Sequence, residues 1–374
     1  MIINFSKAKR MFFSYLPNLI KTEIVKSLPG TYSYFRYAPR FAALNITDNC
    51  CFKCIMCDQW KTHTVNELTE QEWKKVFRQL RDMKIKVISF AGGEPFMRED
   101  LVPLIAYARS LGMEAVVTTN GFLLNENNIK EAIAAGVKHF SISVDAVGRD
   151  FDAIRGVNGA YEKIMESCGI LAFYKGKGLI SVHLYFTLMK STLDIYKEVF
   201  SVAEKFGFPF VVNLFDYTPY FFSGLKTEKD KFWIADEDSE KLKEFQGFMV
   251  DKKRNMPKAV YHLYSEIEYF KRYFKDSIHK NIPCSVSCQR LCIDSQGNVY
   301  GGCWSMGSFG SLKASSLKEI VSCAKFKRRH RDMFFKQCPG CSCGYTTNLR
   351  YSLLAMSREA VLRSALLFNK KPYG

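Results

Sequence analysis

The strongest constraint on the fold is an alternation of short β-rich runs with helical patterns between residues 41 and 220. Each run rich in β-branched and aromatic residues predicts a strand, and a stretch with helical periodicity follows it. The predicted strands cover residues 41–47, 87–90, 115–119, 139–144, 180–188 and 210–214. Strands separated by helices pair in parallel, so the fold class is α/β. Periodicity alone leaves open a partly closed barrel or an open doubly wound sheet, and both place chemistry at the carboxyl ends of strands.

Local signals support this arrangement and extend it along the chain. Thr69 and Glu72 predict a capping box at the start of a helix, and Gly112 and Gly136 predict helix ends. Residues 221–283 are rich in Lys, Glu and aromatic residues and predict a helical connector, with helices near 237–252 and 258–280. The cysteine-rich remainder predicts a hairpin around residues 296–298 and a final helix over 348–368.

The composition is that of a globular protein with strongly basic ends. With 374 residues, 47% of them hydrophobic, the chain is too long and too apolar to be a disordered tail or a disulfide-stapled miniprotein. Of the net charge of +17, most lies in residues 1–40, with seven basic and one acidic side chain, and in residues 323–374, with eleven and two. Basic amphipathic segments pack on their own domain, lie on an anionic membrane surface or bind RNA. The uncharged run at residues 11–20 is too short to span a membrane.

The cysteines indicate metal ligation in a reducing compartment. The chain has 13 of them, an odd number, and most fall within residues 50–57, 284–303 and 338–343. No small-residue cleavage site follows the basic start of the chain, so a cytoplasmic location is expected.

Three thiols with the spacing C-x3-C-x2-C follow the first predicted strand directly: Cys50, Cys54 and Cys57. Three thiolates leave one iron of a four-iron cubane free for an exchangeable ligand, which is what a catalytic metal site needs. The alternative is a zinc knuckle completed by Cys51 or His63. Adjacent side chains usually diverge, so we interpret Cys51 as a bystander.

Polar motifs follow the next three strands as well. They are Gly92-Gly93-Glu94-Pro95, Thr119-Asn120-Gly121 and Ser143-Val144-Asp145. Each alone is an ordinary turn. Together with the thiols, at successive strand ends, they predict one crevice lined by a metal, a carboxylate, amides and hydroxyls.

In these features the sequence resembles the radical S-adenosylmethionine (SAM) superfamily, through the cysteine triplet, the Gly92-Gly93-Glu94-Pro95 run and residues 140–145 with Arg155-Gly156 downstream. The resemblance implies a partial (β/α)6 barrel and an enzyme that cleaves SAM reductively at a [4Fe-4S] cluster. The resulting 5′-deoxyadenosyl radical would abstract hydrogen from a peptide or small-molecule substrate. An electron donor such as flavodoxin or ferredoxin is implied with it.

By this resemblance Cys50, Cys54 and Cys57 would hold the cluster, whose open iron takes the amino and carboxylate groups of SAM. The other implied contacts are Gly92 and Gly93 at the backbone, Glu94 on the ammonium group, Met56 near the adenine, Ser143 and Asp145 near the ribose or carboxylate, Arg155 as a carboxylate partner, and Asn120 on the same wall.

The carboxyl-terminal cysteines are similar to the auxiliary-cluster extensions called SPASM and twitch domains. The full SPASM pattern requires seven cysteines, and no cysteine follows Cys343, so one auxiliary [4Fe-4S] cluster is expected. The implied ligands are Cys284, Cys303, Cys338 and Cys341, with Cys288, Cys292 and Cys343 as substitutes. A structural zinc on the same thiols is the alternative. Cys168 and Cys323 are expected to be ordinary buried thiols.

The resulting organisation has five parts: a basic amphipathic segment at 1–40, the core barrel at 41–220, the helical connector at 221–283, the auxiliary-cluster domain at 284–343 and a basic amphipathic helix at 344–374. Asp216, after the sixth strand, is a candidate proton acceptor from the substrate radical; the alternative is an ordinary loop carboxylate. Competing functions are an RNA-binding or RNA-modifying protein that uses the basic ends, and a zinc-binding scaffold attached peripherally to a membrane.

Overall fold

The structure is a computed structural model. It describes residues 38–62, 66–216, 229–276 and 286–335, together with residues 20, 24, 25, 27–34, 284 and 341. The predicted helix at 348–368, as well as Cys338 and Cys343, falls outside these residues.

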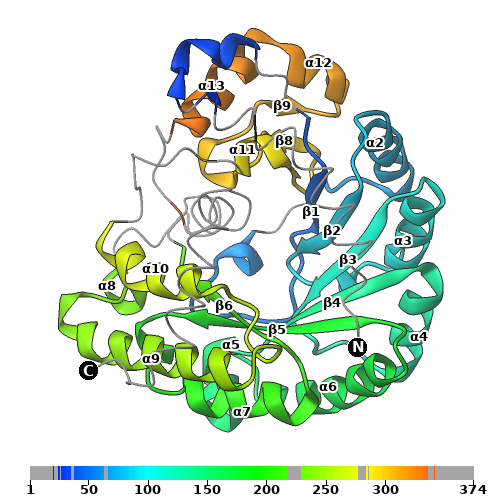
Figure 1. The fold of residues 1–374 in the computed structure, drawn as a ribbon. Coiled ribbons are helices and arrows are strands. Elements are labelled where there is room, and N and C mark those ends of the chain that lie inside the picture. Colours follow the sequence, from blue (N-terminus) through cyan, green and yellow to red (C-terminus); the bar gives the residue numbers. More distant parts are fainter. Residues whose placement is uncertain are drawn as a thin grey trace.

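All six predicted strands are confirmed, and they form a parallel sheet that curves into a partial barrel (Figure 1). They are β1 (Phe41–Thr47), β2 (Val87–Gly92), β3 (Glu114–Thr119), β4 (Val137–Ser143), β5 (Ser181–Leu188) and β6 (Phe210–Leu214). Neighbours in sequence are neighbours in the sheet, from β1 pairing with β2 through β5 pairing with β6. The carboxyl ends of all six strands therefore meet at one rim.

The cysteine-rich part of the chain continues the same sheet beyond β1. Strand β7 (Arg290–Ile293) pairs in parallel with β1, and β8 (Asn298–Tyr300) and β9 (Gly310–Ser311) follow in antiparallel order. The predicted hairpin is confirmed between β7 and β8, where Gly297 has a φ of +84° that favours glycine. The sheet thus has nine strands, in the order β6-β5-β4-β3-β2-β1-β7-β8-β9.

Helices cover the outside of the barrel and cap the added strands (Figure 1). The α-helices are α2 (Glu70–Asp82), α3 (Leu101–Ser110), α4 (Glu126–Ala135), α5 (Gly148–Arg155), α6 (Ala160–Gly176), α7 (Tyr196–Phe206), α8 (Lys229–Phe232), α9 (Ser239–Asn255), α10 (Tyr264–Lys275), α11 (Val286–Gln289), α12 (Leu317–Ser322) and α13 (Ala324–Phe334). The 3-10 turns are η1 (Pro29–Tyr34), η2 (Gln59–Lys61), η3 (Pro95–Met97), η4 (Lys190–Thr192), η6 (Asp236–Asp238) and η7 (Trp304–Met306).

The predicted capping box and a predicted glycine helix end are confirmed. Thr69 and Glu72 form the capping box of α2, and Gly136 ends α4 in the left-handed conformation. In the connector, the helix predicted at 258–280 begins only at Tyr264. Residues 259–261 run alongside β6 instead: the amide of Phe210 donates to the carbonyl of Ala259 at 2.7 Å, and the amide of Tyr261 donates to that of Phe210 at 3.1 Å.

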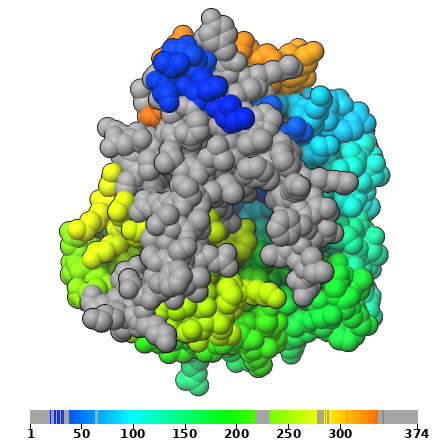
Figure 2. All heavy atoms as spheres, in the orientation of Figure 1, coloured from blue at the N-terminus to red at the C-terminus, as the bar shows by residue number. Residues whose placement is uncertain are grey.

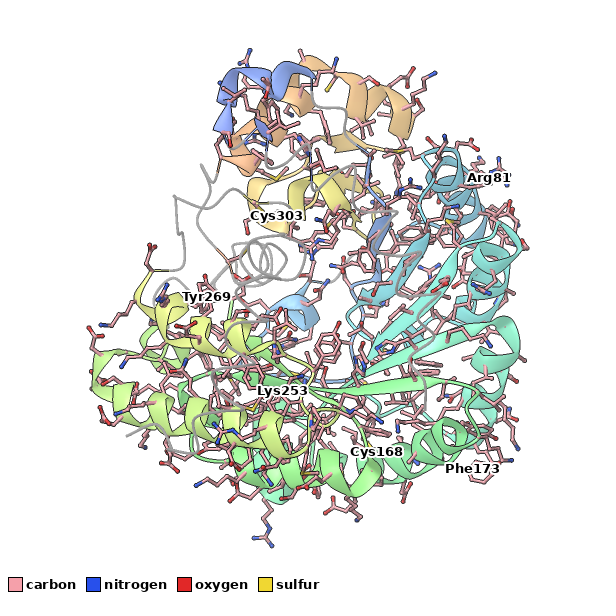
Figure 3. The ribbon with its side chains drawn as sticks, viewed as in Figure 1. Arg81, Cys168, Phe173, Lys253, Tyr269 and Cys303 are labelled. Carbon is pink, nitrogen blue, oxygen red and sulfur yellow. The ribbon has the colours of Figure 1, made fainter. Side chains whose placement is uncertain are left out.

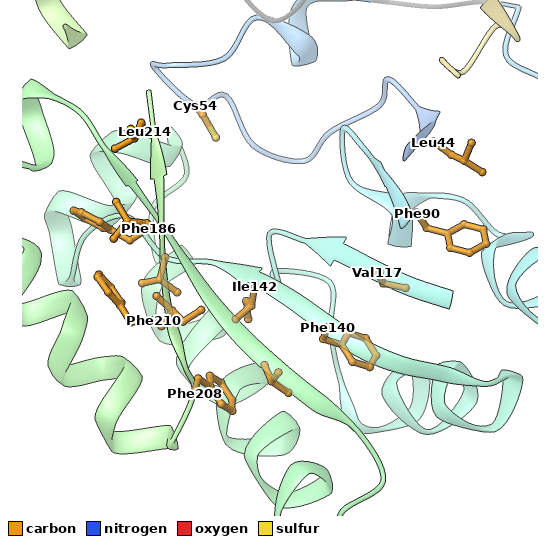
Figure 4. Close-up of a cluster of buried hydrophobic side chains, with 14 of the residues drawn as sticks. Leu44, Cys54, Phe90, Val117, Phe140, Ile142, Phe186, Phe208, Phe210 and Leu214 are labelled. Carbon is orange, nitrogen blue, oxygen red and sulfur yellow. The ribbon is translucent and has the colours of Figure 1, made fainter. Parts of the chain in front are cut away.

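The two faces of the sheet differ in burial. Along β5 the side chains that face the helices, such as Leu184 and Phe186, are fully buried, whereas the alternate ones, such as His183, Tyr185 and Thr187, are half-buried. Figure 4 shows Phe90, Val117, Phe140 and Ile142 in the buried layer. Burial of each such side chain contributes about 1.5–3 kcal/mol, so this layer stabilises the barrel while the concave face stays accessible.

Among the described residues, none of the helices combines the length and the apolar character needed to cross a lipid bilayer.

Candidate active site

The cysteine loop between β1 and η2 is anchored by backbone hydrogen bonds to the end of α5. The amide of Lys53 donates to the carbonyl of Arg155 at 2.9 Å, and the amide of Ile55 donates to that of Ile154 at 3.0 Å. Phe52 is fully buried between the loop and the barrel, where its ring packs against Phe122 and Phe151. The loop is therefore held in place by residues well outside the cysteine motif.

Cys50, Cys54 and Cys57 line one cavity of about 230 Å³ at the carboxyl rim of the barrel. The side chains of the other strand ends reach the same cavity, as predicted from the sequence. Of the residues singled out there, the lining includes Met56, Gly92, Gly93, Asn120, Ser143, Asp145 and Arg155. Glu94 and Asp216 are not part of it.

Arg155 and Asp145 form a buried ion pair on the wall of this cavity. Asp145 Oδ2 accepts from Arg155 Nη2, and Asp145 Oδ1 accepts from the amide of Thr187 at 2.6 Å. Arg155 Nη1 also donates to Cys54 Sγ at 3.5 Å. Burial raises the pKa of the Cys54 thiol, and the Arg155 guanidinium opposes that rise by favouring the thiolate. The Nε of Arg155 is buried without a hydrogen-bond partner.

Gly92 and Gly93 bring the end of β2 into contact with the cysteine loop. A Cβ at Gly93 would lie 2.1 Å from the carbonyl oxygen of Asn49, and one at Gly92 would lie 2.3 Å from that of Thr47. The amide of Gly93 donates to Thr47 at 2.8 Å. We expected these glycines to let a ligand approach the backbone, but the close approach in the structure is to the chain itself.

Glu94 is fully buried behind the cavity. Its Oε1 accepts from Thr119 Oγ1 at 2.8 Å and from the amide of Phe96 at 3.1 Å, while its Oε2 accepts from the amide of Asn120 at 2.8 Å. Burial raises the pKa of Glu94 to about 7, and these hydrogen bonds oppose the rise. Its carboxylate ties the β2 rim to the β3 rim; the predicted contact with an ammonium group stays a prediction.

Asn120 connects this rim to the thiols. Its Nδ2 donates to Cys51 Sγ at 3.3 Å, and its Oδ1 accepts from the amide of Phe122 at 2.9 Å. A hydrogen bond from Cys50 and another from Asn120 lower the pKa of Cys51, whereas the bond to Cys51 and burial raise that of Cys50. Cys51 does not line the cavity, which agrees with its interpretation as a bystander.

Sequence reasoning missed Thr187, Gln59 and Trp60, which also line the cavity. Thr187 lies near the carboxyl end of β5 and holds Asp145, so the rule that chemistry follows strand ends, applied to the fifth strand, would have found it. Gln59 Nε2 donates to Asp48 Oδ1 at 2.8 Å, and Trp60 Nε1 donates to the carbonyl of Cys54 at 3.3 Å. No spacing in the sequence marks these two contacts.

Asp48 joins the cysteine loop to the carboxyl-terminal strands. Its Oδ2 accepts from Ser295 Oγ, in the β7–β8 hairpin, at 2.7 Å. Both side chains are buried. A buried hydrogen bond therefore joins the cysteine loop to the cysteine-rich carboxyl-terminal region.

A second group of thiols lies in that region. Cys303, near β8 in the upper part of the molecule, has its pKa lowered to about 6 by a hydrogen bond with Cys341, with Ser305 and Arg290 adding to the effect (Figure 3). Cys284 is buried beside α13, where its amide donates to the carbonyl of Phe334 at 2.8 Å. Three of the four predicted auxiliary ligands are thus described, and Cys303 and Cys341 are in contact.

The other cysteine predictions have mixed outcomes. Cys168 is a fully buried thiol in α6, as predicted. Cys323 is only half-buried and instead caps α13, accepting from the amide of Phe326 at 3.3 Å. Cys292 is fully buried in β7, opposite Ala43 of β1.

The family model of the radical SAM superfamily matches residues 44–209, which contain the cysteine loop, strands β2 to β5 and the second half of β1. Over this stretch the chain is similar to the radical SAM superfamily. The superfamily's cofactors are a [4Fe-4S] cluster and SAM.

The residues around the cavity fit these cofactors. Three thiols of the superfamily spacing face one space, and the unpartnered Nε of buried Arg155 offers a donor to an anionic group there. Within the described residues, no three His, Cys, Asp or Glu side chains converge to hold a single metal ion. A cubane differs from such a site because its thiolates bind separate irons.

Curated relatives match between about a third and a half of the chain. An AdoMet-dependent heme synthase of Oleidesulfovibrio alaskensis is 32% identical over 185 residues, which are 48% of this chain and 46% of that protein. A PqqA peptide cyclase of Bradyrhizobium diazoefficiens is 33% identical over 131 residues, or 34% of each chain. The chain thus aligns with less than half the length of these relatives.

Solved structures share the fold over a longer stretch. The structure of anSMEcpe with bound AdoMet and the Cp18Cys peptide has a TM-score of 0.63 at 16% identity, covering 88% of this chain and 100% of that one. Streptococcus suis SuiB bound to precursor peptide SuiA has a TM-score of 0.62 at 14% identity, covering 85% and 72%. At these identities the likeness concerns the fold.

Proposed function

We propose that this protein uses a [4Fe-4S] cluster on Cys50, Cys54 and Cys57 to cleave SAM reductively and to abstract hydrogen from a peptide substrate. The observation that carries the proposal is the meeting of these thiols with the β2, β3 and β4 rims around one cavity. When bound, the cluster and SAM supply the one-electron chemistry that generates the radical. A reduced flavodoxin or ferredoxin is the proposed electron donor.

The residues of the chain itself are proposed to bind and orient SAM and to shield the radical from water. Asp145 holds Arg155 in place, and Arg155 in turn presents Nε to an anionic group such as the carboxylate of SAM. Met56, which is buried, is proposed to lie near the adenine. Ser143 and Asn120 are proposed to contact the rest of the nucleoside or the methionyl group. Gly92 and Gly93 contribute by bringing the β2 rim against the thiol loop.

The side chains on the concave face of the barrel favour the hypothesis of a polar, chain-like substrate. The half-buried inward side chains of β3, β4 and β5 include Thr118, His139, His183 and Tyr185, which are hydrogen-bonding groups. Such groups suit the amides of a peptide. The names of two relatives point the same way, since one is a PqqA peptide cyclase and the other is SuiB bound to a precursor peptide. Asp216, half-buried directly after β6, is proposed to accept the proton from the substrate radical.

One auxiliary [4Fe-4S] cluster is proposed on Cys284, Cys303, Cys338 and Cys341. The lowered pKa of Cys303 supports it, because a thiolate is the form that ligates iron. The Nε of Arg290 donates to the carbonyl of Gly302 at 2.8 Å, which holds this cation next to Cys303. Cys288, Cys292 and Cys343 remain substitutes. A structural zinc at these thiols would contradict the proposal.

The first experiment is anaerobic reconstitution followed by iron and sulfide analysis and by measurement of 5′-deoxyadenosine after dithionite reduction. Cys57→Ala should lose the product, whereas Cys168→Ala should retain it. Cys168 is an apt control because its fully buried thiol lies in α6 and not at the cavity (Figure 3). Stoichiometric zinc without iron would overturn the proposal.

The second experiment tests the substrate class. Reconstituted enzyme is incubated with SAM and either a library of short peptides or Fe-coproporphyrin III, which another relative's name contains. Mass spectrometry should show hydrogen loss or a crosslink in the peptide. Conversion of the porphyrin instead would replace the peptide with a tetrapyrrole, consistent with the name of the heme synthase relative.

We also propose that the protein is cytoplasmic and makes peripheral contact with a membrane. An exposed apolar stripe supports this second proposal. Ile20, Ile24 and Leu28, spaced four residues apart, are 48%, 48% and 60% exposed. Val25 packs against Phe334 of α13, whose exposed face is basic, so the apolar stripe lies beside cations. The blue amino-terminal segment lies at the top of Figure 2.

Sedimentation with vesicles of phosphatidylglycerol and phosphatidylcholine tests this contact. Ile24→Asp should abolish it, and Phe173→Asp, an equally exposed site elsewhere, should not. Steeply salt-dependent binding to RNA without sedimentation would favour a nucleic-acid partner instead.

A further inference from the structure

A second cavity, of about 310 Å³, lies between helices α9 and α10, which contact each other in the lower left of Figure 1. None of its described lining residues belongs to the active-site cavity. Its size is within the range typical of small-molecule sites, about 300–1,000 Å³.

The two helices fix the polarity of this groove. Residues Met256–Leu263 connect them, and so short a connection makes neighbouring helices antiparallel. Gln246 Nε2 donates to the carbonyl of Ile267 at 2.7 Å, which sets the register. With this register, Val250 lies across from Tyr264 at one end, and Lys243 lies across from Lys271 at the other.

The groove therefore has an apolar end and a cationic end. Val250, Tyr264 and Ile267 are buried and form the apolar part. Four cations lie toward the other end: Lys243, Lys271, Arg272 and Lys275. Among the described lining residues, Glu268 is the only carboxylate.

The cations at that end form no ion pair with a carboxylate of the described residues. Throughout the ranges that the structure describes, Lys243, Lys271, Arg272 and Lys275 form no ion pair. The basic residues in the last turn of α10 interact favourably with the negative end of the helix dipole. The dipole does not account for Lys243 of α9, which faces them across the groove. Like charges brought together in this way repel each other unless an anion lies between them.

Gly247 keeps the middle of the groove open. It lies inside the 17-residue helix α9, where glycine costs about 1 kcal/mol relative to alanine. A Cβ at this position would meet no atom within 4 Å, so packing within the chain does not require glycine. A larger side chain would fill the groove instead.

We propose that the α9–α10 groove binds a lipid-like phosphate monoester, with the phosphate at Lys243, Lys271 and Lys275 and the alkyl chain along Gly247 toward Val250 and Tyr264. A phosphate matches the cluster better than a carboxylate does, because it carries up to two charges and three acceptor oxygens. The site is independent of SAM cleavage and adds an anionic amphiphile to the ligands of this protein.

Isothermal titration of the full chain with dodecyl phosphate, below its micellar concentration, tests the proposal. We expect saturable binding of one molecule per chain, weakened about tenfold or more in the Lys243→Gln/Lys271→Gln variant. Gly247→Leu should abolish binding. The matched control is Gly169→Leu in α6, because a Cβ there also meets nothing within 4 Å and gains the same helix propensity.

Titrations with two further ligands show whether the phosphate, the alkyl chain or both are needed for binding. Inorganic phosphate should bind far more weakly, and dodecanoate less tightly, than dodecyl phosphate. Equal binding of inorganic phosphate would remove the alkyl chain from the proposal, and equal binding of dodecanoate would remove the phosphate. Unchanged binding by Gly247→Leu with a native thermal melt, or no saturable binding to the wild type, would overturn it.

Discussion

Replacing Gly93 with alanine should separate the β2 rim from the cysteine loop. The added Cβ would lie 2.1 Å from the carbonyl oxygen of Asn49, 2.6 Å from its carbon and 2.7 Å from the carbonyl oxygen of Asp48. All three atoms belong to backbone, so no side-chain rotation relieves the clash. One of the two segments must move.

The cost follows from what that movement breaks. The amide of Gly93 donates to Thr47 at 2.8 Å, and that of Glu94 donates to Asn49 at 2.7 Å. Losing two such bonds costs about 1 kcal/mol each, and overpacking adds about 1–3 kcal/mol. We therefore expect Gly93→Ala to lower the free energy of unfolding by about 3–5 kcal/mol.

Urea denaturation of the metal-free protein measures this loss, and iron analysis after reconstitution measures its effect on the thiols. Gly169→Ala serves as the control, since its Cβ would meet nothing within 4 Å. Iron content should fall in Gly93→Ala and stay at the wild-type level in Gly169→Ala. Equal urea midpoints and equal iron in the two variants would refute the reasoning.

Three further predictions concern charged groups and thiols. Arg155→Lys should reduce SAM affinity at least tenfold in equilibrium dialysis while retaining iron, because lysine lacks the Nε that lies unpartnered in the wall; unchanged affinity would contradict this role. The pKa of Glu94 is raised to about 7 in the folded state, whereas an unfolded carboxyl titrates near 4.5. The free energy of unfolding of the wild type should therefore decline by on the order of 3 kcal/mol as the pH rises from 4.5 through 7. Glu94→Gln should remove that decline, as measured by urea titrations across pH. Cys303→Ala should lower reconstituted iron from about eight to about four per chain while leaving 5′-deoxyadenosine formation measurable, and iron that stays at about eight would exclude Cys303 as a ligand.

Much of the barrel was predictable because its signals are local. The hydrophobic runs, the Thr69–Glu72 capping box and the stop at Gly136 depend on residues a few positions apart, and all appear in the structure as predicted. The meeting of the thiols with the strand-end motifs was also predictable, since parallel strands share one rim. The late start of α10 was missed because residues 259–261 pair with β6, and that contact joins segments about fifty residues apart in the chain.

The amino-acid sequence by itself determined the parallel α/β class, the resemblance to the radical SAM superfamily and the thiols that face the cavity, because spacing along the chain carries that information. Only the tertiary structure decided that Glu94 lies behind the cavity, that Asp48 bridges to Ser295, and that α9 and α10 enclose a groove. Those features depend on contacts between residues far apart in the chain. Which group fills a given space is decided by packing, and packing leaves no periodic trace in the sequence.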